Sequence, residues 1–367
     1  MEIRDYYFKD KMTLADSDTT SIDLKGLNPL SAIIVDIEVT NGSSHCRDHR
    51  IHDDVSLIEV VDGSKVIASL SMKEWAAVSS FVNRHIPKSL FSEWSGVTQK
   101  ERVILNFGRY IGDPEYYLDV GAFKNPELRI ANSFNISDAG GFESGTGKLT
   151  VIGKVIDKGY GSQKGFMATK EVRSFTSKDS GEESIPMPVD YPYRFVLLQI
   201  LKDAQVPSEV ISKVKLSCNN DEFVPVNTYM DDLIDLNKEM FGYFDQVLNI
   251  IRGFGSDVYL DIYDIRQSIA ESNEEYFIME AIDVTGNKVT IDLYDMNASG
   301  TAKAYTNAKR GKVFAVGNAP FGGILIPFGD IDNPEGWLKA NDFDKIDLKL
   351  TQQAEATVNV IVQQVMS

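Results

Sequence analysis

Several short segments of the chain alternate apolar and polar residues, and this period of two is the feature that most limits the fold. In residues 32–40, AIIVDIEVT, the apolar side chains at positions 33, 35, 37 and 39 share one face. The same alternation recurs in residues 258–264, 289–295, 345–351 and 357–364. Turn signals separate such segments, and two are typical of tight hairpins: Asp62-Gly63 and Gly286-Asn287. The pattern predicts an all-β sandwich or barrel.

Two segments have the periodicity of a helix. Residues 72–85 and 229–251 each place apolar side chains along one helical stripe, and the first begins with Ser71 and Glu74 at capping-box spacing. Asn237 interrupts the second stripe. Because an apolar stripe usually packs against a core, we assign both helices to packing rather than to a binding site.

The order of these elements repeats along the chain. Residues 32–39 and 194–201 each predict a strand that is followed by a hairpin and then by a helix, and the two halves are offset by about 158 to 160 positions. After each helix comes an alternating strand, in residues 102–110 and 257–264. The repeat predicts two similar β units, each with a helix inserted after its third or fourth strand.

An Asn-Pro-Glu sequence occurs later in each half, at Asn125 and Asn333, where the offset has grown to 208. About 50 extra residues are therefore expected in the second half, at about 265–312. The polar, proline-containing stretch 176–192 has the composition of a linker. These observations predict one unit over residues 1–180 and a second over residues 181–367.

The charge of the chain limits its partners. Asp and Glu total 54 against 37 Lys and Arg, which gives a formal net charge of −17. A surface this acidic repels phosphate backbones, so direct sequence-specific binding to nucleic acid is not expected. Cys46 and Cys218 are the two cysteines, too few for a disulfide framework. No signal peptide or membrane-spanning run is recognisable, which predicts synthesis in the cytosol.

The stretch SSHCRDHRIHDD, residues 43–54, holds three of the four histidines. His45, His49 and His52 could share one face of a helix and, with Cys46, suggest a metal site. The stretch lies between predicted strands, where a loop is more typical, and its two arginines would repel a cation. We interpret it as a solvent-facing polar loop, with metal binding as the alternative.

Other chemical motifs are incomplete. The sequence FESGTGKLT imitates a phosphate-binding loop, but its glycine spacing is too long and a leucine stands where the magnesium-binding hydroxyl belongs. No G-x-S-x-G nucleophile elbow occurs between a strand and a helix. We therefore predict a protein that is not an enzyme and has no catalytic, metal-binding or cofactor-binding residues and no cofactor.

Two blocks of sequence carry a resemblance to a known family. IEVVDGSKVIASLSMKEWAAVSSF, residues 58–81, and FGRY…YYLDVGAFKNPELRI, residues 107–130, have an element order that recurs from Phe195 onward. This order resembles the double jelly-roll major capsid proteins of tailless icosahedral viruses, a lineage that includes membrane-containing bacteriophages and adenovirus hexon. The resemblance implies two tandem eight-stranded jelly rolls, each with a short inserted helix.

The resemblance also implies a function. Three copies of such a chain would form a homotrimer with six jelly rolls, a pseudo-hexameric capsomer of an icosahedral viral shell. Its partners would be neighbouring capsomers and minor capsid, penton or membrane-associated virion proteins. The protein would be made in the host cytoplasm and reside in the virion, and the extra residues of the second half would form a tower on the outer surface.

Two other classes of function stay open at this point. A carbohydrate-binding or carbohydrate-active β-sandwich would use exposed aromatic side chains, such as Trp94 or Trp337, beside carboxylates. A metal-dependent oxygenase on a jelly roll would depend on the histidine-rich stretch.

Overall fold

The computed structural model describes residues 2–25, 28–47, 49–296 and 303–367. The fold is all-β, as the alternation predicted. In the first unit, the described residues form eight strands in two four-stranded sheets, of order β1-β9-β3-β7 and β2-β8-β4-β5. The strands are β1 (Glu2–Thr13), β2 (Ser17–Asp23), β3 (Leu30–Thr40), β4 (Val55–Asp62), β5 (Lys65–Leu70), β7 (Thr98–Asn106), β8 (Pro126–Ser133) and β9 (Lys148–Lys158).

The second unit repeats this topology. Its strands, within the same described part of the chain, are ordered β10-β24-β12-β22 and β11-β23-β13-β14, so that each sheet has the same sequence of chain positions as its counterpart. Two sheets connected in this way form a jelly roll. The strands are β10 (Phe166–Thr176), β11 (Glu182–Met187), β12 (Tyr193–Leu201), β13 (Ile211–Cys218), β14 (Phe223–Tyr229), β22 (Gly323–Pro327), β23 (Ile346–Gln352) and β24 (Thr357–Met366).

Irregularities in strand pairing recur at matching places in the two units. A shift of register of this kind is a specific local feature, because it changes which side chains face each way along the strand. Three matched pairs occur: Tyr7/Lys9 and Glu171/Arg173 in the first strands, Leu30/Ala32 and Tyr193/Phe195 in the third, and Val55/Leu57 and Ile211/Lys213 in the fourth. The two units therefore share one plan in detail.

The helices α2 (Met72–Asn83) and α4 (Met230–Phe241) each follow the fifth strand of their unit and begin 158 residues apart. Each helix covers an edge strand. The Ser79 hydroxyl accepts a hydrogen bond from the Ile104 amide at 3.0 Å and donates to the Ile104 carbonyl at 2.9 Å. Asn237, which is 158 positions later, makes the same pair of contacts with Leu325, at 2.8 and 2.7 Å.

The remaining helical segments are short. They are α1 (Ile51–Asp54), α3 (Pro207–Val210), and the single 3-10 turns η1 (Val120–Ala122), η2 (Pro334–Gly336) and η3 (Ala340–Asp342).

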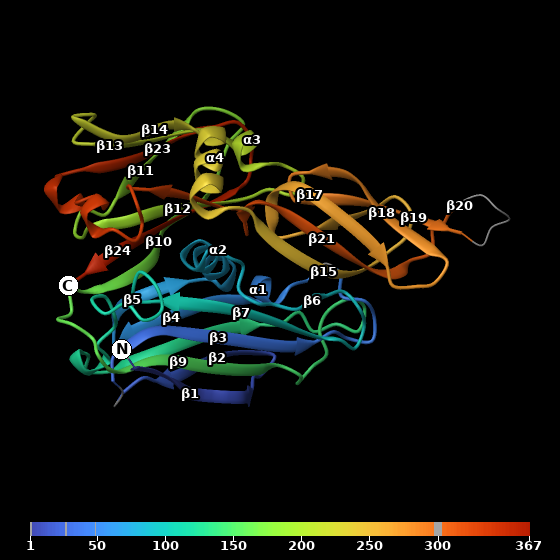
Figure 1. Ribbon diagram of the computed structural model, residues 1–367, viewed down its shortest axis with the longest axis horizontal. Helices are drawn as coiled ribbons and strands as arrows, with labels where there is room; N and C mark the ends of the chain where they lie inside the picture. The colour runs from blue at the N-terminus through green and yellow to red at the C-terminus, as the bar shows by residue number, and fades with distance from the viewer. Residues whose placement is uncertain (1, 26–27, 48, 297–302) are drawn as a thin grey trace.

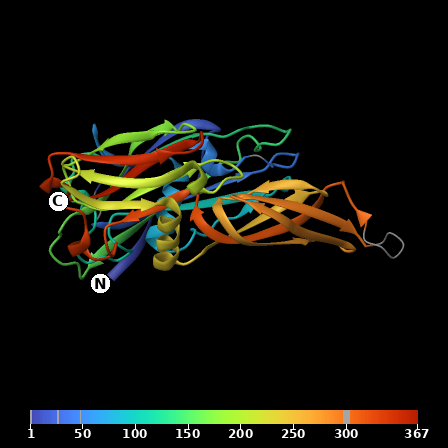
Figure 2. The ribbon, with the colours of Figure 1, turned by 90° about the horizontal axis from the view of Figure 1, so that it is seen from above.

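A tower separates α4 from β22 and projects beyond both jelly rolls along the long axis of the molecule (Figures 1 and 2). Its two sheets, β17-β21-β15-β6 and β16-β19-β18, enclose a separate apolar core. The short strand β6 belongs in sequence to the first unit. The strands are β6 (Phe91–Ser92), β15 (Phe244–Arg252), β16 (Ser256–Tyr259), β17 (Ile262–Ser272), β18 (Phe277–Thr285), β19 (Lys288–Asp295), β20 (Lys303–Ala304) and β21 (Lys309–Pro320).

The tower is where the sequence-based prediction of elements was wrong. The helix predicted over residues 229–251 ends at Phe241, because Gly242 takes a positive φ of 77° and β15 then alternates buried and exposed side chains. Residues 258–264 are not one strand but the end of β16 and the start of β17, in different sheets. The insertion runs from β15 to β21, residues 244–320, rather than over 265–312.

Strand pairing also corrects the division of the chain. Residues 166–176 form β10, which pairs along its length with β24, and residues 182–187 of the predicted linker form β11, which pairs with β23. We therefore propose to divide the units between β9 and β10 instead of at residue 180. The Asn-Pro-Glu sequences are not equivalent, because the first opens β8 and the second forms η2. From β8 to β23 the offset is 220, not 208.

Candidate functional site

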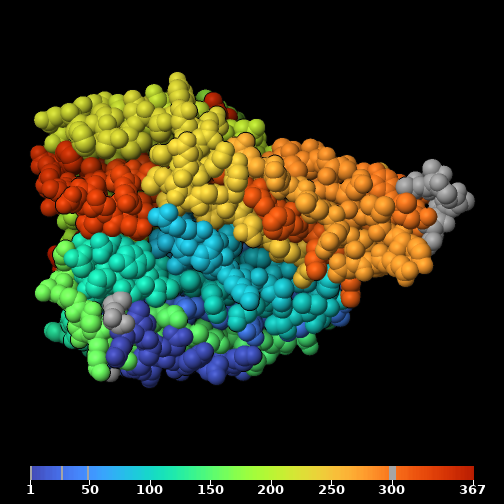
Figure 3. All heavy atoms as spheres, in the orientation of Figure 1, coloured from blue at the N-terminus to red at the C-terminus, as the bar shows by residue number. Residues whose placement is uncertain are grey.

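The two jelly rolls lie against each other along a continuous seam, which is visible between the blue-green and the yellow-red halves of the surface (Figure 3). The sheets meet where Ser69 of β5 bridges Lys170 of β10 in parallel, and this bridge joins four strands of each unit into one eight-stranded sheet. Helix α2 lies in the seam, where Phe81 packs edge-on against Phe241 of α4 at 5.2 Å between ring centroids. We take the seam as the candidate functional site because it sets the relative position of the two units.

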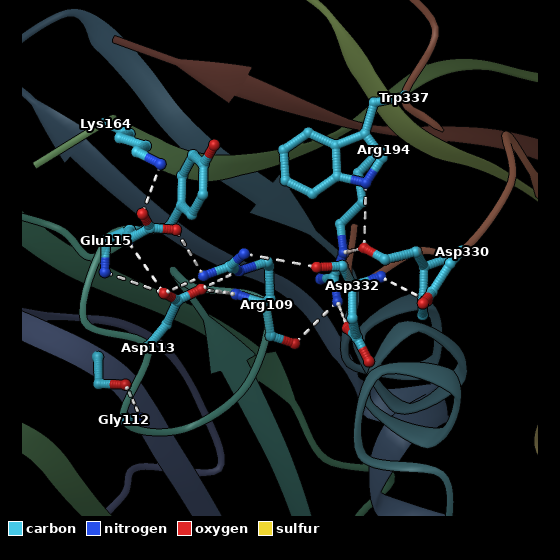
Figure 4. A network of polar contacts seen from close by, with 12 residues as sticks. Arg109, Gly112, Asp113, Glu115, Lys164, Arg194, Asp330, Asp332 and Trp337 are labelled. Atoms are coloured by element: carbon cyan, nitrogen blue, oxygen red, sulfur yellow. Dashed lines mark hydrogen bonds and ion pairs between the residues drawn. The ribbon is translucent and has the colours of Figure 1, made fainter. Parts of the chain in front are cut away.

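Arg194 is the centre of a polar network at one end of the seam (Figure 4). It lies on β12 and is fully buried. Its guanidinium donates to the carbonyl oxygens of Ile331 and Arg109 at 2.8 Å each, to the side-chain oxygen of Gln363 at 2.8 Å and to the carboxylate of Asp332 at 2.9 Å. One side chain thus connects the second unit to the loop that follows β7 of the first.

Arg109 holds that loop in shape. Its guanidinium donates to both carboxylate oxygens of Asp113, at 2.6 and 2.8 Å, and to Glu115 at 3.0 Å, and Lys164 forms an ion pair with Glu115. The hydrogen bonds to Asp113 raise the pKa of Arg109. Burial opposes ionisation of Asp113, but Arg109 and two backbone amides outweigh it and lower the pKa of that carboxyl.

Aromatic packing completes this end of the seam. Trp337 lies 5.5 Å from the ring of Tyr116, between ring centroids, and its indole N–H donates to the Ile331 carbonyl at 3.1 Å. Burial lowers the pKa of Arg194 to about 10, against the raising effect of Asp332, so Arg194 still carries its charge at neutral pH. Across the seam, the guanidinium of Arg194 binds the backbone carbonyl of Arg109, and the guanidinium of Arg109 binds the backbone carbonyl of Asp332 at 3.5 Å. The ion pairs of these two arginines lie within each unit and hold them in place.

A second buried network joins the tower to the first jelly roll. His52 of α1 is 2% exposed, and its Nδ1 lies 2.7 Å from Glu101 of β7. Its Nε2 lies 3.3 Å from Asp261, in the turn between β16 and β17 at the base of the tower, and 3.6 Å from Asp53. Asp53 in turn pairs with Lys73 of α2 at 2.9 Å.

Acidic neighbours set the charge of His52. Burial by itself lowers the pKa of the imidazole, but Glu101, Asp261 and Asp53 outweigh burial and raise the pKa to about 10. The same interaction lowers the pKa of Asp261. His52 is therefore a buried imidazolium at neutral pH, held between a strand of the first unit and the base of the tower.

Glu93 and Arg252 form the other half of this junction. Arg252 of β15 donates to the two oxygens of Glu93 at 2.5 and 2.7 Å, and Glu93 also accepts from the Ile251 amide at 2.9 Å. A cavity of about 320 Å³ adjoins the junction, and its lining carries both signs of charge, among them Arg50 and Asp53.

The interpretation of residues 43–54 as a solvent-facing loop was correct only in part: Ser43, Ser44 and Arg47 are exposed in a loop, but none of the three histidines is exposed. Cys46 and His52 are buried, His45 and His49 are partly buried, and Asp48 lies outside the described residues. The histidines contact different partners: the ring of His45 accepts from the Ser95 amide, that of His49 contacts Asn135, and that of His52 contacts Glu101. Among the described residues, no group of three or more His, Cys, Asp or Glu is placed to hold a metal ion.

Neither candidate tryptophan is an exposed aromatic platform. Trp337 is 6% exposed, although it contributes to the lining of a groove of about 580 Å³ beside β14. Trp94 is partly buried, and its indole N–H donates to the Ile250 carbonyl at 2.7 Å. Sequence reasoning missed Arg194, Arg109 and Glu101. For Arg194 and Glu101 the signal was a charged residue within an apolar strand, and burial against a distant segment shows its role. Arg109 lies in the loop after β7, and its position in the sequence gave no such signal.

Comparisons with known proteins agree with the topology. No family model matches the chain, and no curated protein does. Solved structures match over the whole of this chain. The STIV major capsid protein matches with a TM-score of 0.61, 11% sequence identity and 97% of that chain covered. PBCV-1 VP54 matches with a TM-score of 0.58, 10% identity and 95% coverage, and the major capsid protein from Bacteriophage PM2 with a TM-score of 0.53, 10% identity and 98% coverage.

The chain has the double jelly-roll fold. Its similarity to these capsid proteins covers both jelly rolls and the tower, since all of this chain is aligned in each comparison. The double jelly roll has no helix, within the described residues, that is long and apolar enough to cross a membrane.

Proposed function

We propose that this chain is a major capsid protein. Its function is structural, not enzymatic: it forms a homotrimeric, pseudo-hexameric capsomer, and capsomers assemble into an icosahedral shell. The observation that carries the proposal is the duplication within one chain, joined edge to edge at Ser69 and Lys170, in a fold aligned end to end with capsid proteins. Two like units per chain allow three chains to surround an axis with six similar blocks.

The partners follow from this proposal. Neighbouring capsomers would surround each trimer, and minor capsid, penton or membrane-associated proteins would contact the shell, which places the protein in the virion after synthesis in the host cytoplasm. The tower would stand away from the plane of the shell, since it projects past both jelly rolls (Figure 2). The net charge of −17 supports contacts with protein rather than with nucleic acid.

The experiment is a measurement of mass and shape. The purified chain is passed through size-exclusion chromatography with light scattering, and the main species is imaged by negative-stain electron microscopy. We expect three times the mass of the chain and particles of hexagonal outline. A stable monomer over the whole concentration range would contradict the proposal.

A further inference from the structure

We propose that the outer edge of β1 in one copy of the chain docks against the outer edge of β14 in the next copy, repeating between chains the contact that joins the two jelly rolls within one chain. The inference rests on the proposed self-assembly and names the surfaces that it uses. A second copy of this chain is the only occupant that the proposal allows for these edges.

The seam within the chain serves as the template. It brings the fifth strand of the first jelly roll, β5, beside the first strand of the second, β10, through the parallel bridge between Ser69 and Lys170. Below this bridge, Phe123 packs edge-on against Phe166 at 6.0 Å between ring centroids. Phe123 lies in the turn before β8, and the turn residues Asp119 and Ala122 line the same small cavity.

The equivalent edges are free. The fifth strand of the second jelly roll is β14 and the first strand of the first jelly roll is β1, and in the described part of the chain each pairs on one side only. They lie on opposite margins of the molecule (Figure 1), as a head-to-tail contact requires. Both strands expose aromatic side chains: Tyr6 38%, Tyr7 55%, Phe223 48% and Tyr229 62%.

The second jelly roll has a groove where the first has a smaller cavity, of about 260 Å³. Lys339, Asp342 and Phe343 stand 220 positions after Asp119, Ala122 and Phe123, which is the offset between β8 and β23. They line a groove of about 580 Å³ in which Phe223 stacks on Phe343 at 5.6 Å. In the first jelly roll the start of β10 and the end of β24 line and narrow the corresponding space, so the template predicts that the start of a neighbour's β1 narrows this one.

Equivalent positions in the two jelly rolls set the register of this contact. Of the three shifts in β1, the one at Tyr7/Lys9 corresponds to Glu171/Arg173 in β10, because the partners of these residues, like the starts of β9 and β24, are 209 positions apart. This offset of 164 makes Tyr6 equivalent to Lys170. Helices α2 and α4 begin 158 residues apart, and the same offset makes Asn227 in β14 equivalent to Ser69 in β5.

Tyr6 of one copy should therefore lie opposite Asn227 of the next. The same register brings Glu2 and Ile3 to the groove, because Glu2 corresponds to Phe166. There the carboxylate of Glu2 would approach the ammonium of Lys339, opposite in charge, and Ile3, 38% exposed, would meet an apolar lining. Because the two surfaces differ, the contact is heterologous, and in the proposed homotrimer it would close into a ring of three chains.

The test is site-specific cross-linking of the full chain. Tyr6→Cys and Asn227→Cys are combined in one variant, treated with a short bis-maleimide and run on a denaturing gel. Cys46 and Cys218 are buried, and burial raises the pKa of each thiol to about 11, so they contribute little background at neutral pH. Ser69→Cys with Lys170→Cys is the matched control and should cross-link within one chain, without a change in mass.

We expect covalent species of two and three chains from the Tyr6→Cys/Asn227→Cys variant, and none from either single variant. A trimer by light scattering that gives no such species, while the control pair reacts, would overturn the contact and leave the proposed function standing. Dimers from Tyr6→Cys alone would overturn it as well, because they would show β1 meeting β1. A monomer would refute both proposals. Since Tyr6 and Asn227 are exposed, folding of the variants is checked by thermal unfolding.

Discussion

His52 shows how one side chain can join two parts of a molecule. The imidazolium is enclosed by carboxylates from β7 and from the base of the tower, and by the rings of Phe321 and Phe91 at 5.4 and 6.2 Å between centroids. Loss of the cation would leave Glu101 buried without its main partner. Breaking a buried pair in this way costs far more than the pair contributes when it is intact.

We expect His52→Gln to lower the free energy of unfolding by about 3–5 kcal/mol near pH 6. The folded pKa of about 10 is above the ordinary value of 6.5, so the contribution of His52 is complete below about pH 6.5 and is lost as the pH rises through 10. The difference between the wild type and His52→Gln should therefore shrink from pH 6 to pH 10. Chemical denaturation at several pH values measures it, and a difference independent of pH would contradict the assignment.

Arg194 has the corresponding role between the jelly rolls. We expect Arg194→Met to destabilise the protein by about 3 kcal/mol or more, because the carbonyls of Ile331 and Arg109 and the amide of Gln363 lose their donor. The control is Arg173→Met, whose side chain is 43% exposed and pairs with Glu183, and which should cost about 1 kcal/mol or less. Equal effects of the two substitutions in urea denaturation would count against a special role for the seam.

At the scale of elements, the two helices close the open edges of strands β7 and β22. Each strand lies at the end of its sheet, with backbone groups that lack a strand partner. Ser79 and Asn237, at equivalent positions, each satisfy one N–H and one C=O of the strand below. Asn237 interrupts the apolar stripe of α4 because its side chain satisfies backbone groups of β22. Burying those groups without a hydrogen-bond partner would lower the stability of the fold.

We expect Asn237→Leu to destabilise the protein by about 1–3 kcal/mol, although it completes the apolar stripe of α4, because the backbone of Leu325 loses both partners. Ser79→Ala should act in the same direction. Ser80→Ala is the matched control: its hydroxyl is equally buried but donates only to the Ala76 carbonyl of its own helix at 2.7 Å. If Asn237→Leu raised the thermal unfolding temperature, the stripe would outweigh the backbone contacts and this explanation would fail.

At the scale of the whole molecule, charge acts on the proposed assembly. Each chain carries a net charge of −17, so three chains in a capsomer repel neighbouring capsomers at long range. Salt reduces this repulsion, because the Debye length falls from about 30 Å at 0.01 M to about 8 Å at 0.15 M. We expect association of capsomers to increase with sodium chloride over this range, as measured by light scattering. Association that decreases with salt would indicate contacts dominated by ion pairs between capsomers.

Local pattern was enough to predict the class of fold and the duplication. Alternation in β3, β19, β23 and β24, the hairpins at Gly63 and Gly286, and the start of each helix depend on residues close in sequence, so they can be recognised without knowledge of the fold. The repeated order of strand, hairpin and helix followed from the same patterns and predicted two similar β units. The double jelly roll, which the topology confirms, was what the resemblance to a known family implied.

Contacts between distant segments decided the rest. Whether residues 244–252 continue a helix or begin a strand depends on β21, which pairs with them from more than 50 positions away. The burial of His52 depends on Glu101 and Asp261, 49 and 209 positions further along, and that of Arg194 on both jelly rolls together. The sequence does not show whether a histidine or an arginine is exposed or buried. Only the packing of distant segments around the side chain excludes water from it and surrounds its charge with specific partners.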